Sequence, residues 1–539
     1  MTSISSSEGF CRFALTLFAV LAIHCSAPLQ NCVDGARCDT DGATNDSTTA
    51  HDASTRDDSV DVMDASMNDA SIEAAVPDVS TVDSATTDAS SCPAPVIAAT
   101  GARGSNAPVY VRTSYDYVPT VMLDGVYRMW WCGGIAGDYV LYAEASSLDG
   151  PWHAHGSSVT GSHDVAFQPT GNPADFDGVH TCDPSVVRVD GTYYLYYGGL
   201  GGAGSIGTTA IGVATSADGY HFSRLNGGRA IVQPARDYHT VPNQYGAGQP
   251  SVAYVDGYYY LTFTDSTGRG ANPVNGAGQF VLRSQDPVFQ SGVEELTATG
   301  FTPYSAATHT QHSLTEAFSV DWQYVDTIDA FAMAVDGASG VTQIRLFDRA
   351  LLHQTAMIEV PGNWTEGPGI VSRPDKHAVP SISCGTVPID LMRSVGPGGP
   401  DTWDLAHDGI DMSTGQRCDC TPLSRVFEGS LFSVPGLPLT LIRQGLRLQF
   451  ALSAPASRLA RNSFGVSAAI FNAIPFGASM HMGDEVIGAP GRPAAFHLDG
   501  RAWPASCLEL ITDNGSSITS VSVAAFDAIP AGPSLYCLR

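Results

Sequence analysis

Residues 183–197 read Asp-Pro-Ser-Val-Val-Arg-Val-Asp-Gly-Thr-Tyr-Tyr-Leu-Tyr-Tyr: a short apolar segment, an Asp-Gly pair and an aromatic segment. Asp-Gly between two apolar runs is a strong hairpin signal, because glycine accepts the positive φ that a tight turn requires. The arrangement recurs 66 residues earlier and 66 residues later, with Asp-Gly pairs at 124, 190 and 256. The sequence therefore contains an internal repeat of hairpins.

Each repeat continues with a third apolar segment, at 140–145, 210–215 and 280–284, and then a polar turn. Two more divergent copies are expected over 316–348 and 366–410. A lone four-stranded unit leaves an edge and a face unsatisfied, so repeated units are expected to pack around a common channel. The sequence predicts an all-β protein, a five-bladed β-propeller followed by a smaller C-terminal β domain. A two-sheet sandwich of repeated hairpins is the alternative.

The flanking segments differ from the repeats in composition. Residues 1–25 predict a signal peptide, since Arg12 precedes an apolar run that is too short to span a bilayer. Residues 26–95, rich in Asp, Ser and Ala, predict a disordered acidic linker. We assign 96–417 to the propeller and 418–539 to a C-terminal β domain of unknown role, which carries a weak repeat at 470–475 and 525–530.

The end of the predicted signal peptide bears on localisation. The segment around Cys25, Ala-Ile-His-Cys-Ser, resembles a bacterial lipoprotein cleavage box, although His24 stands where a small residue is expected. A plain signal peptide cut near Ala27 is the alternative. We therefore expect an exported protein that is either a lipoprotein of the outer membrane or cell surface, anchored at Cys25, or a secreted protein.

Charge and cysteine content limit the partners. The formal net charge of -28 argues against nucleic acid, which requires a basic surface. Ten cysteines remain after the signal, which suits an oxidising compartment, and Cys132 with Cys182 and Cys507 with Cys537 are plausible bridges. A metal site at residues 418–420, Cys-Asp-Cys, is a weak alternative. We expect a monomer without a metal site or cofactor, although a structural cation in the channel is compatible with the fold.

The first strand of each propeller blade lines the axis, so residues at the starts of these strands should converge. The expected set consists of Asp116, Asp183, Gln249, Glu316 and Glu366. Neighbouring carboxylates raise each other's proton affinity, and glycoside hydrolysis needs one carboxylic acid and one carboxylate. Each Asp in this set has an alternative role as the cap of a turn. Sugars also bind on aromatic surfaces, and we expect Trp131 to provide one.

Residues 180–197, with their Asp-Pro-Ser and Asp-Gly-x-Tyr-Tyr-Leu signatures, resemble the blade motif of the five-bladed propeller glycosidases, in particular glycoside hydrolase family 43. The resemblance covers the propeller only. It implies an Asp of the first blade as general base, an Asp of the second as pKa modulator and a Glu of the third as general acid. Asp183 then matches the modulator, and Asp116 matches the base if the register slips by a residue or two.

The third position departs from the family pattern, because Gln249 occupies the place of the acid. Either Glu316 or Asp265 takes over the acid role, or the site binds sugar without cleaving it. Glu366, within Thr-Glu-Gly-Pro, is similar to the acid motif but lies in the fifth blade, so we rank it behind Glu316.

Together these observations predict an extracellular glycoside hydrolase-like protein that acts on a poly- or oligosaccharide. The expected catalytic residues are Asp116, Asp183 and Glu316, and the expected substrate-binding residues are Gln249, Trp131, Asp265 and Glu366. A non-catalytic carbohydrate-binding or adhesion propeller is the alternative, since Gln249 replaces the acid. A surface scaffold without a small ligand is the third hypothesis.

Overall fold

The computed structural model describes residues 92–538, except 111–116, 135–137, 203–207, 237–244, 339 and 397–403. Residues Cys92–Arg539 group into one compact unit. Strands dominate the described residues, and the α-helices among them are short and confined to the C-terminal part of the chain. The prediction of an all-β protein is confirmed.

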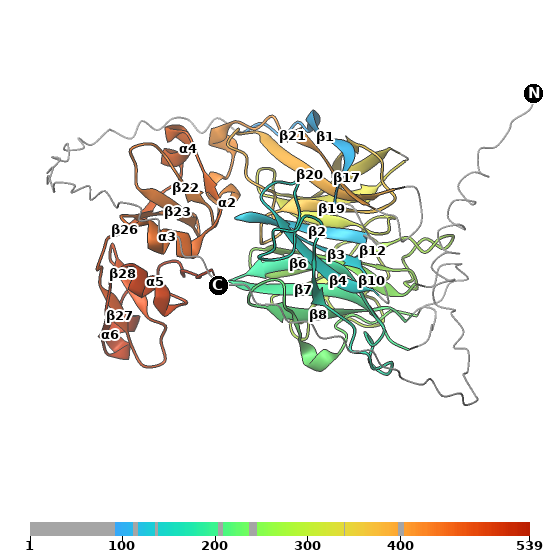
Figure 1. Cartoon of the computed structure of the whole chain (residues 1–539), viewed down its shortest axis with the longest axis horizontal. Helices are drawn as coiled ribbons and strands as arrows, with labels where there is room; N and C mark the ends of the chain where they lie inside the picture. Colours follow the sequence, from blue (N-terminus) through green and yellow to red (C-terminus); the bar gives the residue numbers. More distant parts are fainter. Residues whose placement is uncertain are drawn as a thin grey trace, which may run out of the picture. The chain divides into compact units, whose positions relative to one another are not determined.

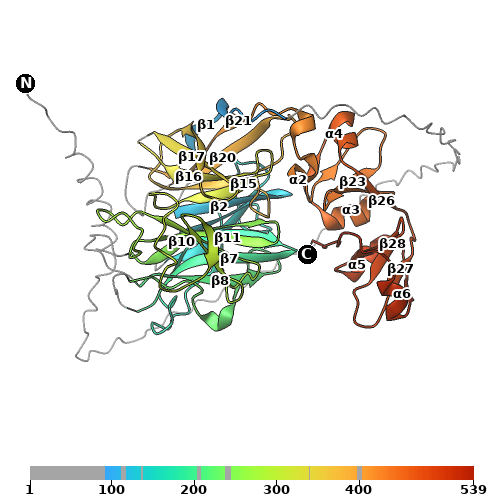
Figure 2. The ribbon, with the colours of Figure 1, turned by 180° about the vertical axis from the view of Figure 1, so that it is seen from behind.

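The repeats fold as five antiparallel units, which we number one to five along the chain. Unit one contains β2 (Tyr117–Asp124), β3 (Val126–Gly133), β4 (Tyr139–Ala145) and β5 (Asp164–Phe167) (Figure 1). Unit two contains β6 (His180–Val189), β7 (Thr192–Leu200), β8 (Ala210–Ser216) and β9 (Ser223–Arg224). Unit three contains β10 (Ala247–Val255), β11 (Tyr258–Asp265), β12 (Gln279–Ser284), β13 (Glu294–Thr297) and β14 (Gly300–Pro303) (Figure 2). Unit four contains β15 (Asp321–Val325), β16 (Ala330–Asp336), β17 (Val341–Asp348) and β18 (Gln354–Pro361).

Unit five joins the two ends of the repeat region. It contains β19 (Glu366–Ser372), β20 (Thr386–Val395) and β21 (Asp404–Ser413), and β1 (Ala98–Tyr110) pairs with β21 as its outer strand. A strand from the start of the described chain therefore completes the last unit. Because β1 precedes β2 of unit one along the chain, this pairing ties the start of the repeat region to its last unit.

The first strands of the units, which we call the inner strands, form a closed cycle. Strand β2 contacts β6, β6 contacts β10, β10 contacts β15 and β15 contacts β19. Strand β19 then pairs in parallel with β2, with Val371 opposite Val121. Five units around one axis is the architecture of a β-propeller, and the inner strands line its channel.

The hairpins between first and second strands form at the predicted Asp-Gly pairs. Asp190 and Gly191 have φ values of 51° and 82°, and Asp256 and Gly257 have φ values of 47° and 87°. Both residues of each turn are in the left-handed region, as a two-residue hairpin with right-twisted strands requires. The repeat signal in the sequence therefore reports a real backbone constraint.

A second left-handed position lies near the start of four inner strands, at Asp183, Gln249, Ser319 and Gly367. Bulges interrupt the strand register next to three of them, between Cys182 and Ser185, Gly248 and Ser251, and Glu366 and Pro368. A non-glycine residue in this region is strained, and bulges often re-aim a side chain beside a functional site. Ser319, rather than the predicted Glu316, is thus the unit-four equivalent of Gln249.

Just beyond these bulges, polar side chains tie each inner strand to the next. The oxygen acceptors take backbone N–H groups of the following unit: Ser185 Oγ from Val252, Ser251 Oγ from Trp322, and Asp321 Oδ2 from Ile370. Between units one and two the direction is reversed, since the hydroxyl of Thr120 donates a hydrogen bond to the carbonyl of Pro184. This belt satisfies backbone groups that the channel would otherwise leave unpaired.

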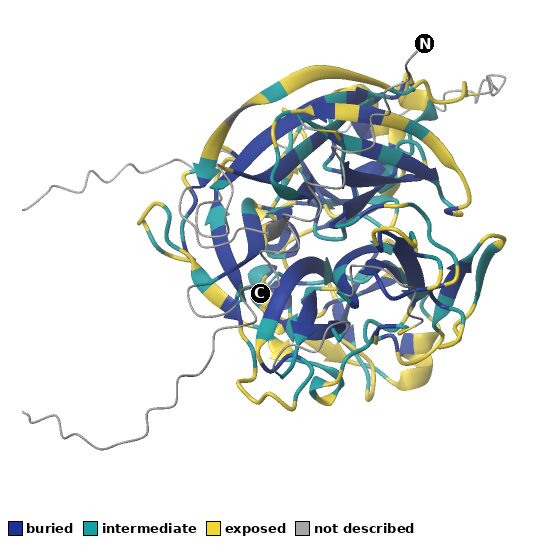
Figure 3. Ribbon diagram, turned by 90° about the vertical axis from the view of Figure 1, so that its right-hand side faces the viewer, coloured by how far each residue is buried: buried dark blue, intermediate teal, exposed yellow. Residues whose placement is uncertain are grey.

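Apolar side chains fill the spaces between neighbouring units. One cluster joins Val252 and Phe280 of unit three to Tyr196 and Ile211 of unit two, and equivalent clusters join the other neighbours. Figure 3 shows the buried residues running along the strands and the exposed residues gathering in the loops. The propeller therefore has five cores between units, and each sheet is buried on both faces.

The C-terminal residues form two copies of one module, offset by 55 residues. In the first copy Leu431 pairs with Leu441 and with Ser463, and in the second Val486 pairs with Phe496 and with Ile518. The first copy contains β22 (Leu431–Phe432), β23 (Leu439–Arg443), β24 (Leu446–Phe450), α3 (Ser453–Leu459), β25 (Ser463–Phe464), α4 (Ala468–Ala473) and β26 (Phe476–Met480).

The second copy repeats this order with β27 (Val486–Gly488), β28 (Ala495–Leu498), β29 (Arg501–Pro504), α5 (Leu508–Asp513), β30 (Ile518–Ser520) and α6 (Val523–Asp527) (Figure 1). Helices α4 and α6 share the same N-cap, since Ser467 Oγ accepts the N–H of Ile470 and Ser522 Oγ accepts that of Ala525. The weak repeat in the sequence is therefore the trace of a duplicated module.

Four disulfides link the described cysteines. Cys132 bonds to Cys182 and Cys507 bonds to Cys537, which confirms both predicted bridges. Cys418 bonds to Cys384 and Cys420 bonds to Cys92, so the metal alternative for these two cysteines is wrong. Within the ranges that the structure describes, no helix is long and apolar enough to cross a membrane.

Candidate functional site

Carboxylates from three strands interact at the end of the channel where the inner strands begin, which we call the mouth. Asp183 lies on β6, Glu366 is the first residue of β19, and Asp336 is the last residue of β16. The negative charges of Asp336 and Asp183 both raise the pKa of Glu366. These three side chains therefore act electrostatically as one group.

Asp183 is buried, with 3% of its surface exposed, and it is held by hydrogen bonds. Its Oδ2 accepts the hydroxyl of Tyr245 at 2.6 Å, and the backbone N–H of Gln249 also donates to the carboxylate. Burial raises the pKa of Asp183, while these donors and the charge of His180 oppose the rise. The surroundings thus fix the orientation of this carboxylate and stabilise its ionised form in part.

Glu366 is in a different environment. Burial, followed by the charges of Asp336 and Asp183, raises its pKa well above the usual range for a glutamate. Within the part of the chain that the structure describes, no donor makes a hydrogen bond to its carboxyl group. Burial without a donor, and the two neighbouring carboxylates, favour the protonated form of Glu366 over the charged form. Glu366 is therefore suited to be a general acid.

Asp336 was not among the predicted site residues. It shares a face of β16 with Ala332 and Ala334, which pack toward unit five, so the same face brings its carboxylate to β19. Its Oδ2 accepts the backbone N–H of Gly367 at 3.1 Å. Burial raises the pKa of Asp336 to about 7. In β16 every second side chain faces the same side of the sheet, and this pattern in the sequence places Asp336 on the same face as Ala332 and Ala334.

His180 and Asp138 form a second pair at the mouth that the sequence analysis missed. His180 Nδ1 lies 2.5 Å from Asp138 Oδ2, and the backbone N–H of Thr181 donates to the carbonyl of Asp138. Burial opposes the charged imidazole, but the charge and hydrogen bond of Asp138 raise the pKa of His180 above its usual value. A protonated His180 lowers the cost of the charge on Asp183.

Glu316 is not on an inner strand. It lies in the loop before β15, is exposed, and accepts a hydrogen bond from Asn272 Nδ2 at 2.8 Å. The expected strand start at Glu316 is wrong because the bulged position of unit four is Ser319, three residues later. Asp116, the expected base, lies outside the described residues, and its role stays a prediction.

The amide of Gln249 joins units three and four. Its Nε2 donates to Ser319 Oγ at 2.9 Å, and its Oε1 accepts from Thr264 Oγ1 at 2.9 Å and from the N–H of Ser319 at 3.1 Å. These bonds fix the wall of the mouth between the two units. The expectation that Gln249 binds sugar stays a prediction.

Asp265 anchors the backbone. It is fully buried, and its carboxylate accepts the N–H of Ala235 and both the N–H and the hydroxyl of Thr267. Burial raises its pKa against these bonds. Its position therefore favours the structural alternative over the expected role in substrate binding or acid catalysis.

Trp131 is a core residue, so its prediction as a sugar platform is wrong. Only 1% of its surface is exposed, and it packs edge-on against Tyr110 with ring centroids 5.0 Å apart. Its cluster includes Val371 and Leu405 of unit five. The alternation of β3 sends Trp131 into the space between units five and one, and Trp130 into the space between units one and two.

Replacing Trp131 by Ala should therefore affect stability and leave substrate affinity unchanged. We expect the free energy of unfolding to fall by about 3–5 kcal/mol, because the substitution leaves a large cavity between two units. Urea unfolding followed by circular dichroism measures this loss. A variant of unchanged stability that binds glycan more weakly would contradict the assignment of Trp131 to the core.

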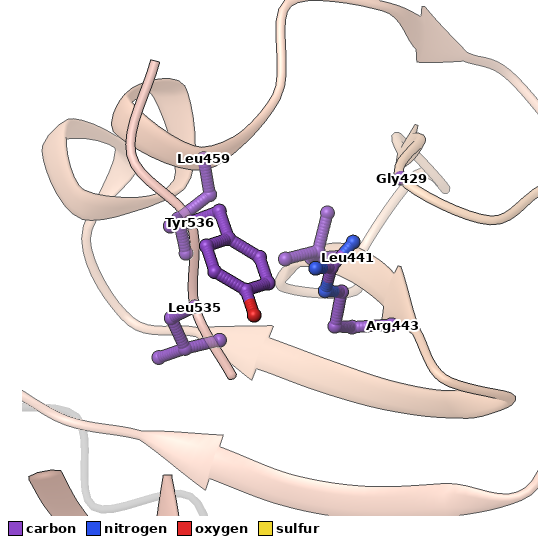
Figure 4. A pocket seen from close by; sticks show the side chains of 6 residues that line it. All are labelled: Gly429, Leu441, Arg443, Leu459, Leu535 and Tyr536. Carbon is purple, nitrogen blue, oxygen red and sulfur yellow. The ribbon is translucent and has the colours of Figure 1, made fainter. Parts of the chain in front are cut away.

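The C-terminal modules contain a small pocket of about 20 Å³ (Figure 4). Leu441, Arg443 and Leu459 of the first copy line it together with Leu535 and Tyr536 near the end of the chain. The guanidinium of Arg443 lies 4.8 Å from the ring centroid of Tyr536 and pairs with Glu428 at 3.5 Å. The pocket is smaller than a typical ligand site, and its polar groups are occupied.

No protein-family model matches the chain. Over 143 residues it is 32% identical to the arabinan endo-1,5-alpha-L-arabinosidase A of Aspergillus niger, a match that covers 26% of this chain and 38% of the relative. Over 129 residues it is 31% identical to a probable enzyme of the same name from Aspergillus flavus, covering 24% and 35%. The chain thus spans less than two fifths of the length of the curated relatives that it matches.

Solved structures of low sequence identity also align with the chain. An alpha-L-arabinofuranosidase of Podospora anserina aligns at 12% identity and a TM-score of 0.37, over 60% of this chain and 98% of that chain. A family 43 enzyme of Xanthomonas citri aligns at 12% identity and a TM-score of 0.36, over 56% and 90%. From the sequence relatives, the resemblance of this chain to the propeller glycosidases of the glycoside hydrolase family 43 type is confirmed.

Proposed function

We propose that this chain is a glycoside hydrolase that cleaves an extracellular poly- or oligosaccharide at the mouth of the propeller. The observation that carries the proposal is the pair of Glu366 and Asp183 on two inner strands: burial and neighbouring charges raise the pKa of Glu366, and hydrogen-bond donors hold the carboxylate of Asp183. Because the sequence relatives are arabinan endo-1,5-alpha-L-arabinosidases, arabinan is the first substrate to test.

In this proposal Glu366 is the general acid. Its raised pKa favours the protonated carboxyl group, which can donate its proton to the leaving oxygen of the sugar. Proton transfer makes the leaving sugar a neutral alcohol, so the glycosidic bond breaks without forming an alkoxide. Glu366 therefore takes the role that the sequence analysis gave to Glu316.

Asp183 is the complementary carboxylate. Tyr245 and the backbone N–H of Gln249 hold it in one orientation, and the charge of His180 favours its ionised state. A fixed carboxylate at the mouth can accept a proton from an attacking water or stabilise the positive charge that develops on the sugar ring. Asp116 stays the alternative base, and a separate variant tests it.

The non-catalytic alternative is weakened by Glu366. That alternative rested on the amide at Gln249, which cannot donate a proton usefully. The propeller does not need an acid at this position if Glu366, an inner-strand residue of unit five, supplies the proton. Sugar binding without cleavage becomes one of the outcomes of the experiment below.

We also propose that the protein acts outside the cell. Four disulfides link all eight cysteines of the described residues, and disulfides of this kind persist in oxidising compartments. Anchoring through a lipid at Cys25 stays part of the proposal. Metabolic labelling with a palmitate analogue, compared between the natural chain and a Cys25→Ser variant, distinguishes a lipoprotein from a secreted protein.

The experiment that tests the function is sugar release by the purified protein from arabinans, xylans, fructans and aryl glycosides. The wild type is compared with Asp183→Asn and Asp116→Asn, and Glu316→Gln serves as a matched control at an exposed carboxylate. We expect release that Asp183→Asn abolishes and Glu316→Gln preserves. Binding of a glycan without release from any substrate would contradict hydrolysis and favour a carbohydrate-binding propeller.

Replacing Asp336 by Asn should change the pH dependence of this activity. Glu366 must be protonated to act, so activity is lost as the pH rises through its pKa. The amide of the variant carries no charge, so the pKa of Glu366 falls, and we expect the alkaline limb of kcat/KM to move down by about one pH unit. The carbonyl of the new amide can still accept the N–H of Gly367.

The control for this profile is Asp348→Asn, the same substitution in the same unit. Asp348 ends β17, the next strand, and its carboxylate caps a turn by accepting the N–H of Leu352. We expect its pH profile to match that of the wild type. A uniform loss of activity in the Asp336 variant, with both limbs in place, would mean that Asp336 has only a structural role.

A further inference from the structure

At the ends of the inner strands opposite the mouth, a short segment of the chain crosses from one unit to the next. Residues 374–376 follow β19 and cross the ends of the inner strands of three units. The carbonyl of Pro374 accepts the N–H of Arg188 in unit two, that of Asp375 accepts Tyr254 in unit three, and that of Lys376 accepts Tyr324 in unit four. We call residues 374–376 the plug.

One side chain of the plug reaches an inner strand. Lys376 has no exposed surface, and its Nζ lies 2.6 Å from both carboxylate oxygens of Asp321 on β15. Asp321 is also part of the belt between inner strands, because it accepts the hydroxyl of Ser251 and the backbone N–H of Ile370. The charge pair therefore joins the inner strands of units three, four and five.

Lys376 is the only lysine in the sequence of 539 residues, and the other basic residues, apart from histidine, are all arginines. Elsewhere in the propeller the chain uses arginine for buried pairs, as at Arg393 and Arg373. An ammonium is a compact point charge on a thin stem, whereas a guanidinium is a broad plane with five donors. At the buried pair where the chain uses lysine, the compact ammonium thus lies against both carboxylate oxygens of Asp321.

We infer that the ammonium of Lys376 is the resident cation of the inner strands and supplies, beside Asp321, the positive charge that a bound metal ion could otherwise provide. A metal ion does not fit beside it, because the ammonium already occupies both oxygens of Asp321. No group of three or more His, Cys, Asp or Glu in the described part of the chain is arranged to hold one. The positive charge that a bound ion would supply is carried instead by the ammonium of a lysine side chain.

The cation supports the mouth through β19. Asp321 binds the N–H of Ile370, and β19 begins with Glu366 four residues earlier. Ser251, which donates to Asp321, follows Gln249 on β10 by two residues. An uncompensated charge on Asp321 would therefore disturb two of the inner strands that form the mouth. The inference itself does not depend on hydrolysis, so it can be tested whether or not the protein cleaves sugar.

The first test compares thermal unfolding of the wild type and Lys376→Met in a chelator and with added K⁺ or Ca²⁺. We expect the wild-type Tm to be unchanged by chelator or salt beyond the small general effect of ionic strength. In Lys376→Met the buried carboxylate has lost its partner, and we expect Tm to fall by roughly 5–15 °C. The double variant Asp321→Asn/Lys376→Met should recover much of this loss, because neither charge remains.

Arg349→Met is the matched control, since Arg349 pairs with Asp256 and Asp329 outside the channel. We expect it to lower Tm by only a few degrees, as a partly exposed pair contributes little. A Tm of the wild type that falls in chelator and returns with one metal ion would overturn the inference. So would a Lys376→Met variant as stable as the wild type.

The second test uses the fact that the sequence has one lysine, and it needs no variant. An amine-acetylating reagent should modify the native protein at the α-amino group alone, and Lys376 only after unfolding in urea. Mass spectrometry of the peptide around residue 376 measures the rate. Labelling of Lys376 in the native protein at the rate of the α-amino group would show that the ammonium is not buried in the channel.

Discussion

Replacing Glu366 by Gln should lower kcat/KM on a polysaccharide by about 10³–10⁴-fold, the range that a general acid contributes. The amide has the same shape and cannot donate a proton to the leaving oxygen. Because Glu366 accepts no hydrogen bond from any described donor, the substitution breaks no structural contact that the structure records. We therefore expect the variant to fold, to unfold at the same or a higher temperature, and to bind glycan.

The dependence on leaving group makes this prediction specific. An aryl glycoside with a dinitrophenyl leaving group departs as a stable phenolate and needs no acid. We expect Glu366→Gln to keep most of its activity on this substrate, whereas Asp183→Asn loses activity on both kinds of substrate. Equal losses on activated and natural substrates would show that Glu366 is not the proton donor.

The stability of Glu366→Gln should also depend on pH. The raised pKa of Glu366 means that the folded protein binds its proton more tightly than the unfolded chain does. Folding stability in the wild type therefore falls as pH rises above the ordinary pKa of a glutamate, because the folded state then holds more protons than the unfolded state. The gain in Tm from Glu366→Gln should be absent near pH 4 and should grow toward pH 8.

Replacing Arg393 by Met should produce a large loss of stability. Arg393 on β20 is fully buried and pairs with Asp408 Oδ2 at 2.6 Å. Its guanidinium also donates to the carbonyls of Pro361 and Gly362 in unit four. We expect the free energy of unfolding to fall by about 3–5 kcal/mol, because the substitution leaves a buried carboxylate and two carbonyls without their donor. Urea unfolding measures this change.

The double variant Arg393→Met/Asp408→Leu is the control for charge. Removing both charges avoids an unpaired buried carboxylate, so we expect it to regain part of the lost stability. The stability that the double variant does not regain then measures the loss of the hydrogen bonds from Arg393 to the carbonyls of unit four. If the single variant were as stable as the wild type, Arg393 would not be the link between units four and five that its contacts indicate.

The strongly patterned parts of the fold could be predicted from the sequence. The Asp-Gly turns at 190 and 256 require positive φ at both residues, so the chemistry of the turn determines the hairpin and its spacing reveals the repeat. The bridges Cys132–Cys182 and Cys507–Cys537 also follow from the sequence reading. These features are local or repeated, and each depends on only a few residues.

The site could be predicted only in part. Asp183 follows from its motif, but Glu316 was placed on an inner strand because steps of 66–67 residues were extended into a divergent unit. The bulge falls instead at Ser319, and sequence spacing does not reveal where a bulge inserts a residue. The motif of Glu366 suggests an acid, but the sequence does not show that the closed cycle of inner strands brings unit five to the same channel mouth as unit two.

Contacts between units were beyond the reach of the sequence. Asp336 reaches Glu366 from a second strand, and Lys376 reaches Asp321 across the channel from a segment after β19. Trp131 was expected at the site but lies in the core between two units, because its position on β3 directs the side chain away from the channel mouth and into that core. Such placements depend on how units pack around the axis, which no local pattern contains.

The most direct measurement is proton NMR of linear arabinan incubated with the wild-type protein and with Glu366→Gln under the same conditions. New anomeric signals from reducing ends report cleavage, and line broadening of the arabinan signals reports binding. Our account predicts new reducing ends with the wild type, none with Glu366→Gln, and binding by both. Equal cleavage by both proteins, or binding of arabinan by the wild type without cleavage, would contradict the account of Glu366 and Asp183 as a catalytic pair.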